Sequence, residues 1–166
     1  MIRLLDAIRF ESIEVFKDLL ASAEDINARF DFDETTLLHK AAGHGNAEAC
    51  QILINHRLDI EARDDAGHTP LFYASAFGIN PCLTLLLNGS DVNARSTELS
   101  TAAHWAAHSE NIDVLFALID HGADIHAIDI QGMTPLMLAS NDATLHAATS
   151  YITRKAAIDA IDAIKA

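Results

Sequence analysis

The chain has few of the residues on which several classes of protein depend. Its 166 residues include only two cysteines, three prolines and 6% aromatic residues, and 11 basic residues stand against 24 acidic ones. Two cysteines are too few for a disulfide framework. The formal net charge of −13 makes nucleic acid and anionic membranes poor partners, because both carry phosphates. Half of the residues are nevertheless hydrophobic, so the chain can bury enough surface to fold.

Long apolar runs are also missing. No uninterrupted apolar stretch approaches the ~20 residues that a membrane span needs. Arg3, Asp6 and Arg9 interrupt the segment in which a signal peptide would have its apolar core. Cys50 and Cys82 lie in apolar runs, and we expect both to be buried, reduced thiols. Together these observations predict a cytoplasmic protein.

Two short patterns recur at a nearly constant interval. The first reads TLLHKAA, TPLFYAS, TAAHWAA and TPLMLAS, beginning at Thr36, Thr69, Thr101 and Thr134, which are 33, 32 and 33 residues apart. The second reads DINA, DIEA, DVNA and DIHA, beginning at Asp25, Asp59, Asp91 and Asp124. Threonine caps helices well, and a following proline suits the first helical position. One such unit cannot cover its own apolar face, so neighbouring units must stack.

The patterns resemble the T-P-L-H-x-A and G-A-D-V-N-A signatures of the ankyrin repeat family, whose period is about 33 residues. The resemblance covers essentially the whole chain. It implies an all-α ankyrin-repeat solenoid of about five helix–turn–helix units with hairpin-like loops. Within a single domain, 1–166, we place the units at about 1–30, 31–63, 64–95, 96–128 and 129–166. In this family the histidine of the first signature is structural, and His39 and His104 occupy that column.

The two terminal units depart from the repeat pattern. The first lacks the Thr-Pro signature, and we expect it to be a cap with helices near residues 4–10 and 13–21. In the last unit Leu145, Ala148 and Ile152 continue a helical pattern that runs on into an alanine-rich tail, 153–166. We expect this tail to extend a capping helix, with docking of a partner as the alternative.

Three fragments suggest chemistry. Asp31 and Asp33 have the D-x-D-x-T spacing of aspartate-dependent phosphatases, which need an apolar strand before the motif, and residues 26–30 do not provide one. Residues 43–48 resemble a phosphate-binding glycine loop, but a glutamate stands in place of its third glycine. His104 and His108 share a helix face without a third ligand. We therefore expect no enzyme, no cofactor and no metal; a phosphatase using Asp31 and Asp33 is the less favoured alternative.

The ankyrin resemblance implies recognition through a concave face built from loop tips and first helices. Projecting the repeat register onto that face predicts these protein-binding residues: Phe32, Asp33, Thr35, His44, Asp65, His68, Tyr73, Phe77, Glu98, Trp105, His108, Ile130, Met133, Asn141 and Asp142. Six of them are large and apolar, and such anchors are enriched at binding hot spots. We expect at least three of these six to be exposed; the alternative is that some, such as Tyr73 and Trp105, pack sideways between repeats.

Carboxylates gather at the expected loop tips. They are Asp31, Asp33, Glu34, Asp64, Asp65, Glu98 and Asp129. Arg29, Arg63 and Arg95 recur just before these tips and offset part of the charge. An acidic edge can simply keep an apolar array soluble, or it can guide a basic protein partner and speed association.

The protein is therefore predicted to be a monomer when free and to bind a protein with a basic surface rather than nucleic acid or membrane. Two functions remain open: a scaffold or adaptor, and a dedicated inhibitor, such as an immunity or antitoxin protein, that masks the active site of a basic enzyme.

Overall fold

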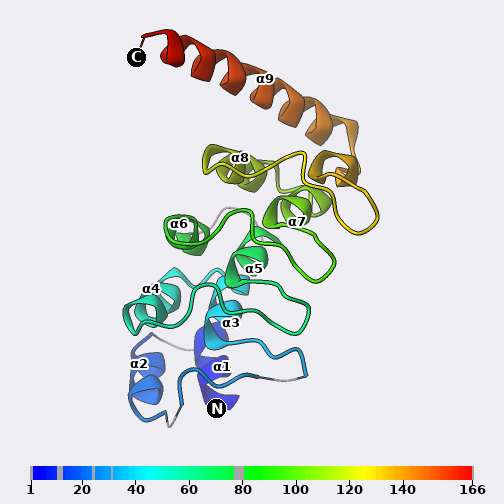
Figure 1. Cartoon of the computed structure of the whole chain (residues 1–166). Coiled ribbons are helices and arrows are strands. Elements are labelled where there is room, and N and C mark those ends of the chain that lie inside the picture. Colours follow the sequence, from blue (N-terminus) through cyan, green and yellow to red (C-terminus); the bar gives the residue numbers. More distant parts are fainter. Residues whose placement is uncertain (1, 11–12, 24, 31, 77–80, 166) are drawn as a thin grey trace.

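The computed structural model describes residues 2–10, 13–23, 25–30, 32–76 and 81–165. Within these residues helices alternate with turns, and β pairing is limited to one isolated bridge between Phe30 and Thr35. The expected all-α solenoid is confirmed (Figure 1). None of the helices in the described ranges is both long and apolar enough to cross a membrane.

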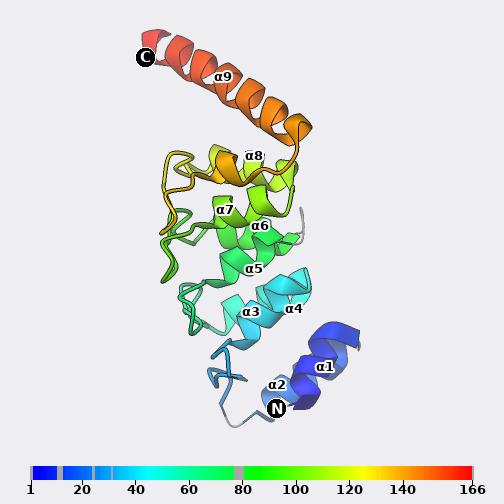
Figure 2. The same cartoon turned by 90° about the vertical axis from the view of Figure 1, so that its right-hand side faces the viewer.

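The helices form two stacked columns. The first helices of the units are α1 (Ile2–Phe10), α3 (Leu37–Gly43), α5 (Pro70–Ala76) and α7 (Ala102–His108). The second helices are α2 (Ile13–Ala21), α4 (Ala47–Asn55), α6 (Pro81–Leu87) and α8 (Ile112–Asp120). Long loops leave the stack on the side of the first helices, and Figure 2 shows them lined up along one edge. The two helices expected in the N-terminal unit are confirmed as α1 and α2.

Small side chains explain why the first helices stack closely. In α7, Ala102, Ala103, Ala106 and Ala107 are all buried, and alanines allow neighbouring helices to approach. Thr101 is the N-cap of α7, as the sequence predicts, and Thr36 has the same place before α3.

The signature histidines connect neighbouring units. In its neutral form, the buried His39 ring accepts the Thr36 N–H at Nδ1 (3.1 Å) and donates from Nε2 to the His68 carbonyl (3.0 Å). His104, two units further along the chain, makes the same contacts: its Nδ1 accepts the Thr101 N–H (3.0 Å), and its Nε2 donates to the Met133 carbonyl (3.0 Å). Each ring therefore fixes the start of its own helix to the loop of the next unit.

The loops are joined by a ladder of backbone hydrogen bonds. Asp65 donates its N–H to the Asp33 carbonyl (3.0 Å), Thr97 to Ala66 (2.9 Å) and Ile130 to Glu98 (2.9 Å). The close approach explains Gly67: its φ is +78°, and a Cβ there would lie 2.9 Å from the Thr97 nitrogen.

Three arginines form a second ladder beside the first. Arg29, Arg63 and Arg95 each donate to a carbonyl within their own loop, at Glu34, Gly67 and Leu99. Each also reaches a carbonyl of the following unit, at Arg63, Arg95 and Ile128 respectively. These guanidinium groups are thus bound to backbone oxygens, a structural role that the sequence interpretation, which assigned them to charge balance, did not include.

The last unit is compressed. Its first helix is only one 3-10 turn, η1 (Pro135–Leu138), and α9 (Asp142–Lys165) begins soon after it. Asn46 and Asn141 both cap a second helix, accepting N–H groups from Ala49 (3.0 Å) and Thr144 (2.6 Å). Asn141 follows its unit's signature threonine by seven residues, whereas Asn46 follows Thr36 by ten, so three residues are missing and the first helix is shortened.

Helix α9 covers the end of the stack with its first half. Tyr151 stacks on Phe116 of α8, with ring centroids 4.0 Å apart, and donates to Asp120 (2.7 Å). Lys155 pairs with the same carboxylate at 3.0 Å. Residues 156–160 are exposed, and the helix continues beyond the stack (Figure 1).

The two cysteines correct one expectation. Cys50 and Cys82 are fully buried, as predicted, but they form a disulfide that links α4 to α6. They lie 32 residues apart, about one repeat, so the repeat itself brings them to facing positions on neighbouring helices. The cytoplasm is a reducing compartment, in which disulfides are rare, so this bond does not support the cytoplasmic location, which stays a prediction.

Candidate protein-binding groove

Two hollows lie along the first helices. The first, about 580 Å³, is lined by Arg9, His39, Lys40, Gly43, His44, Tyr73, Ala76 and Trp105. The second, about 410 Å³, is lined by Ala76, Glu98, Ser100, His104, Trp105, His108, Ser109, Asp129, Gln131 and Leu138. We call them the basic hollow and the acidic hollow after their charged side chains. Both share Ala76 and Trp105, so together they form one groove from α1 to η1.

Aromatic rings make the middle of this groove. Tyr73 lies edge-on to His39, with centroids 5.2 Å apart, and His68 packs on Trp105 at 4.6 Å. Trp105 also meets Phe72 at 5.8 Å and Tyr73 at 6.1 Å. Rings from three successive units thus support one another, which confirms that Tyr73 and Trp105 pack sideways between repeats.

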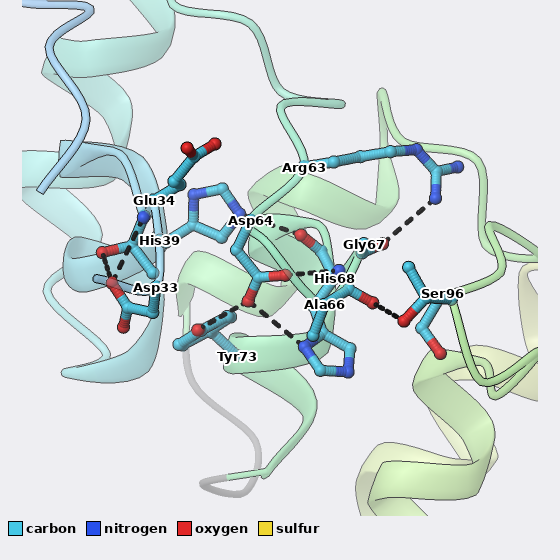
Figure 3. Close-up of polar contacts among 12 residues, drawn as sticks. Asp33, Glu34, His39, Arg63, Asp64, Ala66, Gly67, His68, Tyr73 and Ser96 are labelled. Atoms are coloured by element: carbon cyan, nitrogen blue, oxygen red, sulfur yellow. Dashed lines mark hydrogen bonds and ion pairs between the residues drawn. The ribbon is translucent and has the colours of Figure 1, made fainter. Parts of the chain in front are cut away.

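A buried carboxylate holds this cluster in place. Asp64 accepts the His68 N–H (2.8 Å), contacts His68 Nδ1 (3.2 Å) and accepts the Tyr73 hydroxyl (2.9 Å), as Figure 3 shows. Burial and the bond to Asp64 raise the pKa of Tyr73, which therefore stays a hydrogen-bond donor at neutral pH. Asp64 was expected among the loop-tip charges, but it is 7% exposed and serves inside the loop.

Histidines differ in what they offer to a partner. Burial lowers the pKa of His39 and of His104, so both rings are neutral at pH 7 and occupied by backbone groups. Burial also lowers the pKa of His44, and the charges of Arg9 and Lys40 add to that effect. The ring of His44 is exposed in the basic hollow, whereas His108 is exposed in the acidic one.

The large apolar residues predicted for the binding face divide into two groups. Each long loop is numbered here by the unit whose first helix it precedes. Phe32 and Ile130 are exposed, at 103% and 65%, on the tips of the second and fifth loops. Tyr73, Trp105 and Met133 are half-buried, and Phe77 lies outside the described residues. Two of the five described residues are therefore exposed, and the ring cluster covers much of Tyr73 and Trp105. Our expectation of at least three exposed among the six stays a prediction, since it depends on Phe77.

Some polar residues of the predicted site turn out to be structural. Thr35 is fully buried, and its hydroxyl donates to Asp33 (3.0 Å), so its side chain is closed to a partner. Asn141 caps α9 and donates to Glu110. Met133 gives its N–H to Asp129 (2.9 Å) and its carbonyl to His104. His68 stays half-buried within the ring cluster, and Asp142, in the first turn of α9, is exposed.

Fewer of the loop-tip carboxylates are exposed than the sequence suggests. Glu34, Asp65 and Glu98 are exposed. Asp33 is half-buried and pairs with Lys40 at 3.4 Å; burial opposes its ionisation, but bonds from Thr35 and the Lys40 charge outweigh this and lower its pKa. Asp129 closes its own loop by accepting the N–H groups of Gln131 and Met133 (both 2.9 Å). Asp31 lies outside the described residues.

The sequence interpretation missed one of the charged residues of the groove. Arg9, at the end of α1, lines the basic hollow beside Lys40 and His44. The N-terminal unit lacks the Thr-Pro signature, so no register existed to project its residues onto the face. The basic residue in the last turn of an expected first helix was the only available signal.

Neither chemical alternative gains support from the geometry. Residues 25–30, which precede Asp31, hold turns and the single bridge of Phe30 instead of the strand that a phosphatase site needs. Among the described residues no group of three or more His, Cys, Asp or Glu side chains is arranged to hold a metal ion.

The comparisons agree with the repeat architecture. A family model described as "Ankyrin repeats (3 copies)" matches residues 4–96 and 80–151. The chain belongs to the ankyrin repeat family. It is 32% identical to dog inversin over 126 residues, 74% of the chain and 12% of that protein. It is 34% identical to the human neurogenic locus notch homolog protein 1 over 135 residues, 80% of the chain and 5% of that protein.

The chain thus spans only about an eighth or less of the curated relatives that it matches. What it shares with them is the repeat array. Ankyrin repeats form protein–protein interaction modules, and this is the class of protein to which the chain belongs.

Proposed function

We propose that the chain is a non-enzymatic binding module that holds a protein partner with a basic surface in its groove and against its acidic loop tips. The observation that carries the proposal is the continuous groove over α1, α3, α5 and α7, with Trp105 shared by both of its hollows. Its half-buried rings are held rigidly, so binding orders few side chains. The free chain acts as a monomer in this proposal.

Charge supports the basic character of the partner. The net charge is −13, and Glu34, Asp65 and Glu98 are exposed on three successive loops. Exposed carboxylates of this kind raise the rate of association with a basic surface more than they raise affinity. Phe32 and Ile130 add exposed apolar contacts on the second and fifth loops.

The test is capture of a partner followed by kinetics with the purified partner. A variant carrying Asp65→Lys and Glu98→Lys should associate more slowly, by about tenfold at low salt, and with a flatter salt dependence. The matched control carries Glu48→Lys and Asp113→Lys on the second helices, which gives the same net charge away from the groove. Equal slowing of both variants would reject steering by the loop tips.

A second candidate is a dedicated inhibitor of a basic enzyme. It is favoured by the acidic hollow, where Glu98 and Asp129 flank a recess that could accept a cationic group from an active-site rim. If this candidate is right, one equivalent of the chain abolishes the activity of the captured partner, and Glu98→Lys restores it. A captured partner without activity, or one that stays active when bound, favours the adaptor.

A further inference from the structure

The two halves of the groove carry opposite charge. Arg9, Lys40 and His44 line the basic hollow, which lies over α1 and α3. Glu98 and Asp129 line the acidic hollow, which lies over α7 and the fourth and fifth loops. A uniformly basic partner segment would be attracted at one end and repelled at the other. The charge pattern therefore selects opposite charges at the two ends of a bound segment, and not only a partner that is basic overall.

The basic side chains of the basic hollow lie near one another. Arg9, Lys40 and His44 line the same hollow, and, besides burial, the charges of Arg9 and Lys40 lower the pKa of His44. Lys40 already pairs with Asp33, but at 3.4 Å and with both side chains partly exposed, so the pair is weak.

The acidic hollow has the composition of a site for one cationic side chain. The indole of Trp105 and the carboxylates of Glu98 and Asp129 line the same recess. A lysine or arginine gains from both, because cations are attracted to the face of tryptophan and to carboxylates. Leu138 adds an apolar wall suited to the aliphatic stem of such a side chain.

The spacing between the two hollows follows from the stacking of the helices. From α3 to α7 there are two helix-to-helix steps of about 8–10 Å each, or about 16–20 Å in all. An extended chain advances about 3.3 Å per residue, so this distance corresponds to about five or six residues.

We propose that the groove binds one extended segment of the partner lengthwise, with a basic side chain in the acidic hollow and an acidic side chain in the basic hollow, five or six residues apart. This inference rests on the proposed function and adds the charge order that the partner segment must carry. The partner is thus basic overall but presents a segment of mixed charge at the contact.

Trp105 makes the inference directly measurable. It is the only tryptophan of the chain and lines both hollows, so its emission reports on occupancy of the groove. The probes are tryptophan-free ten-residue peptides with blocked ends, in an alanine–serine background, that carry one Arg and one Glu at separations of two to eight positions. Peptides with two Arg, two Glu or two Gln at the same positions are the comparison.

The expected result is tightest binding by Arg/Glu peptides at a separation of five or six, in one of the two orders along the peptide. The preferred order reports the direction in which the segment runs. Binding should be about two- to fivefold tighter than for the Arg/Arg peptide, the range that one partly exposed charge contact gives. Equal binding of Arg/Arg peptides, indifference to separation, or no response of Trp105 would overturn the inference.

Variants locate the effect. Glu98→Gln should remove the gain in affinity that the Arg of the peptide provides, and Lys40→Gln should remove the gain that its Glu provides. Two control variants, Asp113→Asn on α8 and Arg154→Gln on α9, should leave both gains unchanged. Circular dichroism confirms that each variant is folded. If the peptides show no preference while the protein partner is still captured, the charge order is wrong and the proposed function stands. If no partner is captured, the proposed function itself fails.

Discussion

The Tyr73 hydroxyl donates a hydrogen bond of 2.9 Å to the buried carboxylate of Asp64, and this bond ties the centre of the groove to the loop beside it. The loop side is fixed by His68, which binds the same carboxylate through its N–H at 2.8 Å. A binding surface and a structural loop therefore depend on one buried charge. The first prediction tests this dependence.

Replacing Tyr73 by Phe should lower the free energy of unfolding by about 1–2 kcal/mol, because the buried Asp64 carboxylate loses one of its donors. Urea unfolding measures the loss. The control is Tyr151→Phe, which removes a similar bond of 2.7 Å to Asp120. Asp120 is exposed, so the control should cost less than about 1 kcal/mol. Equal losses in the two variants would contradict the role assigned to burial.

Acidification should destabilise the protein through His39 and His104. Burial lowers the pKa of both rings below the ordinary value of 6.5, so the unfolded chain binds protons at a pH where the folded chain does not. Their contribution is complete above pH 6.5 and is lost as the pH falls through the lowered pKa values of the folded state.

Thermal unfolding between pH 7.5 and pH 5.0 measures this effect in the wild type and in His104→Gln. The variant should be less stable at pH 7.5 but lose less stability on acidification. His56→Gln, at an exposed position, should follow the wild type. A variant whose stability falls as steeply as that of the wild type would show that His104 does not contribute.

The arginine ladder predicts that lysine cannot replace arginine. Arg63 donates to two carbonyls, those of Gly67 (3.0 Å) and Arg95. The planar fork of the guanidinium suits two acceptors, whereas an ammonium is a point donor on a flexible stem. Arg63→Lys should cost about 1 kcal/mol and speed hydrogen exchange at the Thr97 amide, which belongs to the neighbouring backbone ladder. Arg57→Lys, on an exposed turn, should change neither.

The disulfide predicts a stability that depends on redox state. Cys50 and Cys82 close a loop with a sequence separation of 32, for which chain entropy gives about 3–4 kcal/mol. The urea midpoint should therefore fall on reduction of the wild type and stay constant in the Cys50→Ala, Cys82→Ala double variant. Mass spectrometry after alkylation in denaturant without reductant should find no modified thiol. Two alkylated cysteines under these conditions would restore the original expectation of free thiols.

The two halves of helix α9 should contribute differently to the stability of the protein. Deleting residues 156–166 should change the free energy of unfolding by less than about 1 kcal/mol, because the described residues 156–160 are exposed. Tyr151→Ala should cost about 3 kcal/mol, because it removes the stack on Phe116 and the bond to Asp120. A large loss on truncation would instead assign the capping role to the tail.

The repeat register was the part of the structure that could be predicted well. Thr36 and Thr101 begin helices where the signature indicates, and the histidines three residues later fill their structural column. These positions follow from local capping and from periodic burial, which sequence reports directly. The groove also lies where the first helices predict it, with Trp105 near its centre.

The loops were harder to predict because side-chain direction there depends on contacts between units. Asp64 and Asp65 are neighbours of the same type, yet one is buried among hydrogen-bond donors and the other is exposed. Nothing in the local sequence distinguishes them. The disulfide and the arginine ladder have the same origin, since both join residues about one repeat apart.

The ladder of Arg29, Arg63 and Arg95 also bears on how freely this molecule can vary. Every acceptor in it is a main-chain oxygen, which any residue provides. Of the side chains at the corresponding tip positions, Thr97 adds a hydrogen bond from its hydroxyl to the Ala66 carbonyl (2.9 Å). The ladder uses none of the side chains of Phe32, Asp65 and Ile130, which occupy the same position in the other loops and differ completely in chemistry. A new specificity could be selected at these three positions while the frame that presents them remains intact.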